Sequence, residues 1–153
     1  MTTTAFPWEL IVAALNRSGL VEPVSHAFPI RVPPATTIQI VLDTKGKVFL
    51  PYFAKLVCEP SGLLDVILSA DGNVVYAVEG CDSEMFRDPI DFARIGFPWV
   101  AKQNMTLTIV NTSTTEEGYV SFLYGGGLMS PDAYRLICER LWGRVREWLL
   151  YGK

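Results

Sequence analysis

The sequence predicts a mainly β protein: a jelly-roll-like β-sandwich with an N-terminal and a C-terminal α-helix. Three observations predict this fold. Apolar residues recur with the spacing of a helix face near both ends of the chain, whereas the segments between alternate apolar and polar residues with a period of two. Gly, Pro and Asp divide those segments into short runs. About seven such runs in two meanders are typical of a sandwich or a jelly roll.

Length and composition favour one domain over residues 1–153. Half of the residues are apolar and 19% are charged, which supplies a core and excludes extensive disorder. The formal net charge of −3 gives no general attraction to nucleic acid. No apolar run is long enough to span a membrane, and the N-terminus lacks the basic region of a signal peptide. We therefore expect a protein that is made in the cytoplasm and remains there.

The first element is a helix, predicted over residues 7–18. Pro7 suits the first helical turn, and Gly19 provides a stop just after the last one. The apolar residues follow the helical spacing of one face: Trp8, Ile11, Val12 and Leu15.

The β-sandwich core is predicted over residues 23–125. It begins with a proline-punctuated stretch, 23–34, which we expect to form edge strands or extended arms. Two strands follow at 36–42 and 47–58, and alternation predicts that one face of the second carries Val48, Leu50, Tyr52, Ala54 and Leu56.

The next predicted hairpin joins strands 63–69 and 73–78 through Asp71-Gly72, because Asp-Gly is among the strongest hairpin signals. Residues 80–103 are predicted to form an irregular connection with a short helical turn over 88–94. Pairing resumes at 105–111 and 119–124.

Three consecutive glycines, Gly125 to Gly127, are predicted to end the last strand, because glycine permits a sharp change of direction. They superficially resemble a phosphate-binding loop. They lack the Gly-x-Gly-x-x-Gly pattern and the Lys-Ser/Thr ending that such loops require.

The last predicted element is a helix over residues 130–151, with Ser130 as its N-cap and Pro131 at the first helical position. Its final turns are crowded with aromatic and leucine side chains. Because Trp and Tyr are enriched in subunit contacts, these residues and one from the first helix are the interface candidates: Trp8, Trp142, Trp148, Leu149 and Tyr151.

Motifs for catalysis are missing from the sequence. His26 is the single histidine, and no Gly-x-Ser-x-Gly elbow accompanies it. The three cysteines, Cys58, Cys81 and Cys138, form no Cys-x-x-Cys pair, so a zinc finger is excluded. Two alternatives remain open for them: buried free thiols, or one disulfide and one free thiol. We expect no catalytic residue and no cofactor.

A weak candidate for a cation site lies in the irregular connection, where acidic side chains are concentrated. Hard cations bind several oxygens converging from a loop. Arg87 and Arg94 are close in sequence, so the alternative is a solvated acidic loop with ion pairs. The candidate residues are Asp82, Glu84, Asp88 and Asp91.

The β portion, roughly residues 30–125, resembles small single-jelly-roll or β-sandwich virion proteins, of the minor capsid or decoration type, from bacteriophages and archaeal viruses. Four segments carry the resemblance: the entry into the first strand at 33–40, the Asp71-Gly72 hairpin, and the closing strands at 107–113 and 119–125. The resemblance implies a non-enzymatic subunit that forms symmetric homo-oligomers and contacts other virion proteins. It also implies that the protein is located in the virion, after assembly in the host cytoplasm. It supplies no catalytic residues.

The sequence thus predicts a structural assembly protein. The alternative is a β-sandwich module that binds a carbohydrate or a protein. Exposed rings of Tyr52, Phe53 and Tyr76 aligned on one sheet face would favour the alternative, and their burial would count against it.

Overall fold

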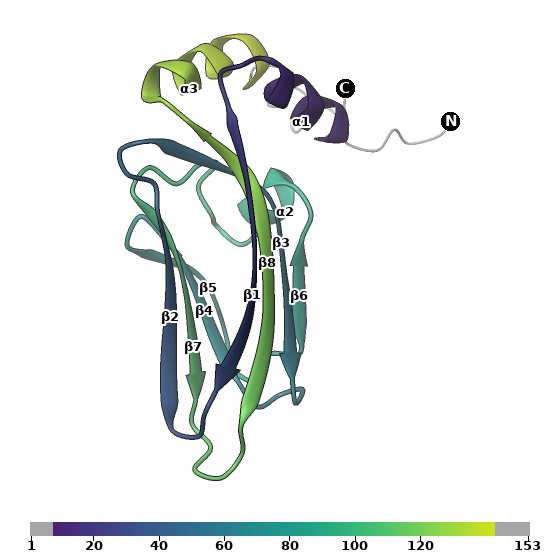
Figure 1. Cartoon of the computed structure of the whole chain (residues 1–153), viewed down its shortest axis with the longest axis vertical. Helices are drawn as coiled ribbons and strands as arrows, with labels where there is room; N and C mark the ends of the chain where they lie inside the picture. Colours follow the sequence, from purple (N-terminus) through teal and green to yellow (C-terminus); the bar gives the residue numbers. More distant parts are fainter. Residues whose placement is uncertain (1–7, 143–153) are drawn as a thin grey trace, which may run out of the picture.

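The computed structural model describes residues 8–142, which form two four-stranded antiparallel sheets packed face to face with helices at one end (Figure 1). This confirms the predicted sandwich with one helix near each end of the chain. The elements are α1 (Trp8–Arg17), β1 (Glu22–Val32), β2 (Thr36–Asp43), β3 (Val48–Glu59), β4 (Asp65–Ala70), β5 (Asn73–Val78), β6 (Ser83–Phe86), α2 (Pro89–Arg94), β7 (Asn104–Asn111), β8 (Gly118–Met129) and α3 (Pro131–Ile137), followed by a π-helical turn, Cys138–Trp142.

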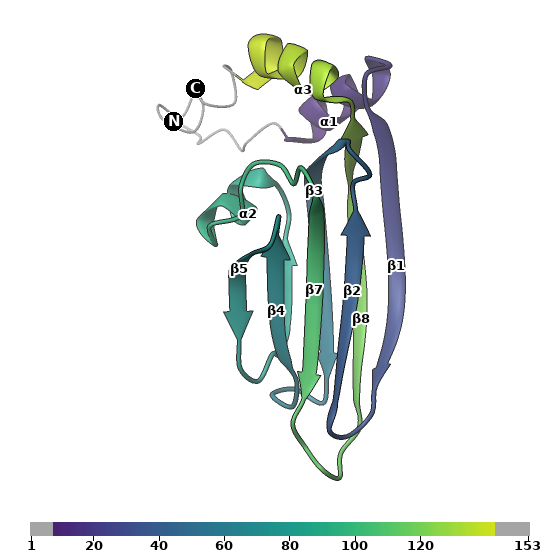
Figure 2. The same ribbon diagram turned by 90° about the vertical axis from the view of Figure 1, so that its left-hand side faces the viewer.

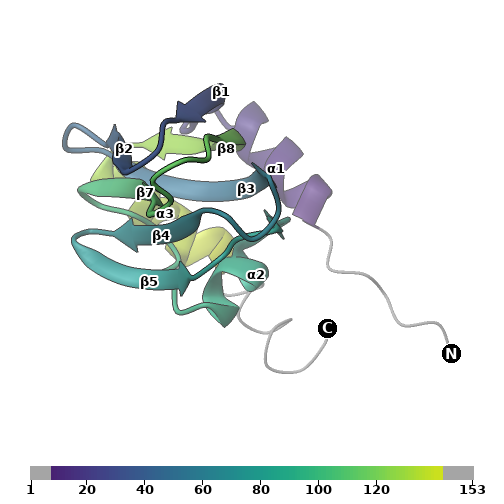
Figure 3. The same ribbon diagram turned by 90° about the horizontal axis from the view of Figure 1, so that it is seen from below.

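The strands pair in a nested order. One sheet has the order β1-β8-β3-β6 and the other β2-β7-β4-β5, so β1 pairs with β8, β2 with β7, β3 with β6 and β4 with β5. The chain is in effect one long antiparallel hairpin rolled over on itself. Figure 3 shows the two layers from below, and Figure 2 shows α2 at the same end of the sandwich as α1 and α3.

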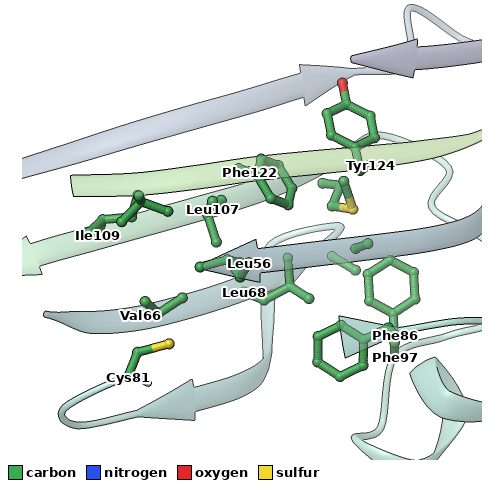
Figure 4. Close-up of a cluster of buried hydrophobic side chains, with 14 of the residues drawn as sticks. Leu56, Val66, Leu68, Cys81, Phe86, Phe97, Leu107, Ile109, Phe122 and Tyr124 are labelled. Atoms are coloured by element: carbon green, nitrogen blue, oxygen red, sulfur yellow. The ribbon is translucent and has the colours of Figure 1, made fainter. Parts of the chain in front are cut away.

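The core lies between the two sheets. Alternate side chains of each strand point inward, and most of them are almost fully buried. Figure 4 shows part of this core, in which side chains from both sheets interdigitate: Leu56, Val66, Leu68, Leu107, Ile109, Phe122 and Tyr124.

One face prediction for β3 is wrong. The pairing of β3 with β8 shifts between Pro51 and Phe53, so Tyr52 is an extra residue in a β-bulge. A bulge reverses the inward and outward positions beyond it. Consequently Phe49 shares the inter-sheet core with Ala54 and Leu56, whereas the second cluster, under the terminal helices, contains Val48, Leu50 and Tyr52.

The predicted strand end at Gly125 to Gly127 is also wrong, because β8 continues to Met129. These glycines lie where aromatic rings of β3 cross the β8 backbone. An added Cβ would be 2.4 Å from the Phe53 ring at Gly125, 2.4 Å from the Phe49 ring at Gly126 and 2.7 Å from the Tyr52 hydroxyl at Gly127. The glycines therefore make room for rings on both faces of the strand.

The remaining β predictions are largely confirmed. The proline-rich stretch contains β1, an edge strand of its sheet. Asp71 and Gly72 both have positive φ, 52° and 83°, as a type I′ turn requires. The irregular connection contains the predicted helical turn as α2, with Asp88 as its N-cap, and also a strand, β6, that was not predicted.

The C-terminal helix begins as predicted. The Ser130 hydroxyl accepts a hydrogen bond from the Ala133 amide at 3.1 Å, and Pro131 is the first helical residue. Residues 143–151 of the predicted helix lie outside the described residues.

Candidate functional site

The four candidate cation ligands each have a separate structural role. Asp82 accepts a hydrogen bond from Ser61, and Glu84 accepts one from the Tyr76 hydroxyl at 2.5 Å. Asp88 caps α2, and Asp91 pairs with arginines on both sides of it in sequence. Within residues 8–142 no three His, Cys, Asp or Glu side chains are grouped so that they could hold a metal ion.

His26 is an exposed residue of β1, and its ring packs on other rings. The imidazole centroid lies 5.8 Å from that of Phe28 and 5.5 Å from that of Tyr124. These contacts place His26 at the margin of the inter-sheet core, where β1 is an edge strand.

The interface candidates separate into two groups. Trp8 is 7% exposed and packs inside the chain, where its ring meets Tyr52 edge-on and its Nε1 donates a hydrogen bond to the Tyr52 carbonyl at 3.2 Å. Its ring is therefore used to attach α1 to the sandwich. The side chain of Trp142, and Trp148, Leu149 and Tyr151 as a whole, lie outside what the structure describes.

The three rings that would form a carbohydrate platform do not line up on an exposed face. Tyr52 is buried, and Phe53 packs against the same cluster under the helices. Tyr76 is half-buried, meets Phe86 edge-on and donates its hydroxyl to Glu84. This arrangement counts against a platform built from these rings.

The outer face of the sheet β2-β7-β4-β5 is the most distinctive surface of the described chain, and we call it the open face. Figure 2 looks onto this sheet, and no described helix crosses it. Its outward side chains are uncharged along the middle of every strand, with Asp43 and Asp65 at the rim. The outward residues are Thr37, Gln39, Val41, Ile67, Ser69, Val74, Ala77, Thr106, Thr108 and Val110.

The outer face of the other sheet is charged and uneven. Arg31 pairs with Glu117, which also accepts a hydrogen bond from the Tyr119 hydroxyl at 2.6 Å. The Tyr119 hydroxyl and the Arg31 guanidinium together lower the pKa of the Glu117 carboxyl. Beside this group lies an open hollow of about 290 Å³, lined in part by Pro29, Val57 and Glu59.

Two polar side chains that sequence reasoning missed hold loops in place. The Nδ2 atom of Asn111, which is 1% exposed, lies within 3.2 Å of the carbonyl oxygens of Val32, Pro33 and Glu116. The Asp71 carboxylate accepts hydrogen bonds from the amides of residues 102–104. The sequence signal for both is a short polar residue at a strand end, which is also typical of ordinary turns.

Comparison of the sequence with models of known protein families and with curated proteins finds no match. In the part of the chain that the structure describes, every helix is too short or too polar to cross a lipid bilayer.

Proposed function

We propose that this protein is a non-enzymatic structural subunit that assembles with copies of itself, as a capsid, decoration or other virion component. The observation that carries the proposal is the open face. The chain has 29 charged residues, 13 basic and 16 acidic, yet the middle of this four-stranded face has none. Depletion of charge is the compositional mark of the buried centre of a protein interface.

A second copy of the chain is the occupant that fits this face. Two copies meeting here bring no like charges together in the middle of the contact, although each copy carries a net charge of −3. Most of the outward side chains are also short, being Thr, Ser, Val or Ala, and Gln39 and Ile67 are the exceptions.

The size of the open face indicates a weak individual contact. Strands of six to eight residues, at ~3.3 Å per residue and ~4.8 Å between strands, give an area of roughly 450 Å². A stable interface buries about 800 Å² on each partner. We therefore expect assembly to require several contacts per subunit, as in a particle, where many weak contacts act together.

The strand order supports the virion part of the proposal. The first strand pairs with the last, the second with the second last, and so on to the central pair β4 and β5. This is the strand order of a jelly roll, a fold that occurs in viral capsid proteins, lectins and cupins. A metal-binding cupin needs several histidines, and the sequence has one. Neighbouring genes for capsid or portal proteins would support this part, whereas a metabolic operon would count against it.

The test is the mass in solution, measured by light scattering over a range of concentrations. Thr108→Arg places a charge in the middle of the open face, and Ser121→Arg is the matched control on the outer face of the other sheet. We expect the wild type and Ser121→Arg to associate at high concentration and Thr108→Arg to stay monomeric with an unchanged melting temperature. A wild type that stays monomeric throughout, or equal association of both variants, would contradict the proposal.

A second candidate is a ligand-binding module that uses the hollow near Tyr119. The observation that favours it is the 50% exposure of the Tyr119 side chain beside an ion pair, because an exposed ring with polar neighbours suits a sugar. A glycan array with wild type and Tyr119→Ala separates the two functions. Glycan binding by a monomer, lost in Tyr119→Ala, would favour the module.

A further inference from the structure

Two of the three cysteines meet in the core although they are distant in sequence. Cys58 lies at the end of β3, and Cys81 lies just before β6. Their Sγ atoms are 3.0 Å apart, and the side chains are 3% and 1% exposed. An S–S bond is ~2.05 Å long, so the two sulfurs would have to approach by only about 1 Å to be bonded.

The backbone on both sides of the pair is held by hydrogen bonds. The Cys58 amide donates to the Asp82 carbonyl at 3.1 Å, and the Cys81 amide donates to the Leu64 carbonyl at 2.7 Å. The Cys81 carbonyl accepts from the Gly62 amide at 3.1 Å. These bonds keep the two thiols facing each other, because neither segment can turn away without losing them.

We propose that Cys58 and Cys81 are a disulfide site that links β3 to the segment entering β6, with Cys138 remaining a free thiol. The proposal is independent of the assembly function. It chooses between the alternatives left open by the sequence, because contact between two particular thiols cannot be read from spacing.

The oxidant is a small-molecule disulfide such as oxidised glutathione. One cysteine thiolate attacks it to form a mixed disulfide and releases one glutathione thiol. The second thiolate then attacks the protein sulfur of the mixed disulfide, forms the Cys58–Cys81 bond and releases the second glutathione. Two electrons pass from the protein to the oxidant, and each departing glutathione carries one of the two thiol protons.

Access determines how fast the bond forms. Burial raises the pKa of both thiols, and the thiolate is the reactive species. Reaction is therefore slow in the closed native state and faster while the chain folds or when the segment after β5 opens. We expect oxidation during refolding to be faster than oxidation of the folded protein.

The test uses the full chain, treated with oxidised glutathione either folded or during refolding, with reduced protein as reference. Thiols are then counted in denaturant. We expect the count to fall from three to one and the mass to fall by two hydrogen atoms. Cleavage after Glu79 separates the two cysteines into different peptides, which should stay joined until a reductant is added.

Serine variants identify the pair. Cys138→Ser should still form the bond, whereas Cys58→Ser and Cys81→Ser should not. Because the cysteines are 23 positions apart, the bond should raise the melting temperature by roughly 10 °C in wild type and in Cys138→Ser. Three outcomes would overturn the proposal. They are three remaining thiols after both treatments (folded and refolding protein), stable glutathione adducts on the two cysteines, and a disulfide that includes Cys138.

Discussion

The two outer faces of the sandwich differ in what covers them and in the side chains they present. At the helical end of sheet β1-β8-β3-β6, the outward residues of β3 are apolar and are buried under α1 and α3: Val48, Leu50 and Tyr52. The open face of sheet β2-β7-β4-β5 carries uncharged side chains along the middle of its strands, and no described helix lies over it.

The outward side chains of the first sheet suit the helices that cover its end. We call the part of the first sheet that carries Val48, Leu50 and Tyr52 the covered face. Side chains pack closely there because Gly127 of β8 leaves room for both Val21 and Tyr52. None of the outward residues of the open face is a glycine.

The largest expected effect on stability comes from adding a side chain at one of the three glycines of β8, Gly125 to Gly127. In Gly126→Ala the new Cβ would be 2.4 Å from the Leu50 carbonyl oxygen and 2.4 Å from the Phe49 ring. Because backbone is one of the two obstacles, we expect a loss of about 3 kcal/mol or more in the free energy of unfolding, measured with urea. Ser121→Ala, on the exposed part of the same strand, should change it by less than about 0.5 kcal/mol. Equal losses would show that the glycines are not needed for packing.

The next effect tests how α1 is attached to the covered face. Trp8→Ala removes a buried ring that packs on Tyr52, and we expect a loss of about 3 kcal/mol in the free energy of unfolding. Trp8→Phe keeps an aromatic ring but loses the hydrogen bond to the Tyr52 carbonyl, for a loss of about 1 kcal/mol. Hydrogen exchange should show α1 opening in Trp8→Ala. Unchanged protection of α1 in that variant would mean that other contacts hold the helix.

The smallest expected effect is the pH dependence that Tyr52, on the covered face, gives to the free energy of unfolding. Burial raises the pKa of Tyr52 to about 12, while a tyrosine in the unfolded chain ionises near ~10. Between these values the unfolded chain has lost the proton and the native state retains it, so the free energy of unfolding falls as pH rises from 10 to 12. Below pH ~10 the stabilisation is fully present.

Tyr52→Phe removes this contribution, so denaturant titrations should show a shallower decline over the same pH range. The slope is the quantity to compare, because the variant also loses the hydrogen bond from the tyrosine hydroxyl to Asn16 at every pH below ionisation. An unchanged slope would mean that Tyr52 ionises equally in both states.

Much of the local structure is predictable because its causes are local. Pro131 after Ser130 begins a helix through a cap and a fixed φ. Asp71-Gly72 makes a tight turn because both residues tolerate positive φ. The alternation in β2 and β7 reflects one buried and one exposed face, so these strands were correctly placed.

The wrong predictions share a long-range cause. Strict alternation in β3 fails at Tyr52, because the bulge exists only relative to the register of β8. The three glycines Gly125 to Gly127 resemble a strand end in the sequence. They are needed inside the strand because the rings of Phe49 and Phe53, from the neighbouring strand, pack against their backbone. The strand β6 is short and lies in irregular sequence, and it is defined by its pairing with β3.

The fold class, the terminal helices and the scarcity of catalytic motifs can be predicted without a structure, since periodicity, turn residues and residue counts are properties of the chain alone. Which residues meet depends on the tertiary structure. Strand order brings four outward rows that are uncharged in the middle into one face, and it places Cys58 beside Cys81 across 23 positions. Those neighbours depend on pairing between distant segments, and pairing is selected by the packing of the whole core, which no local pattern specifies.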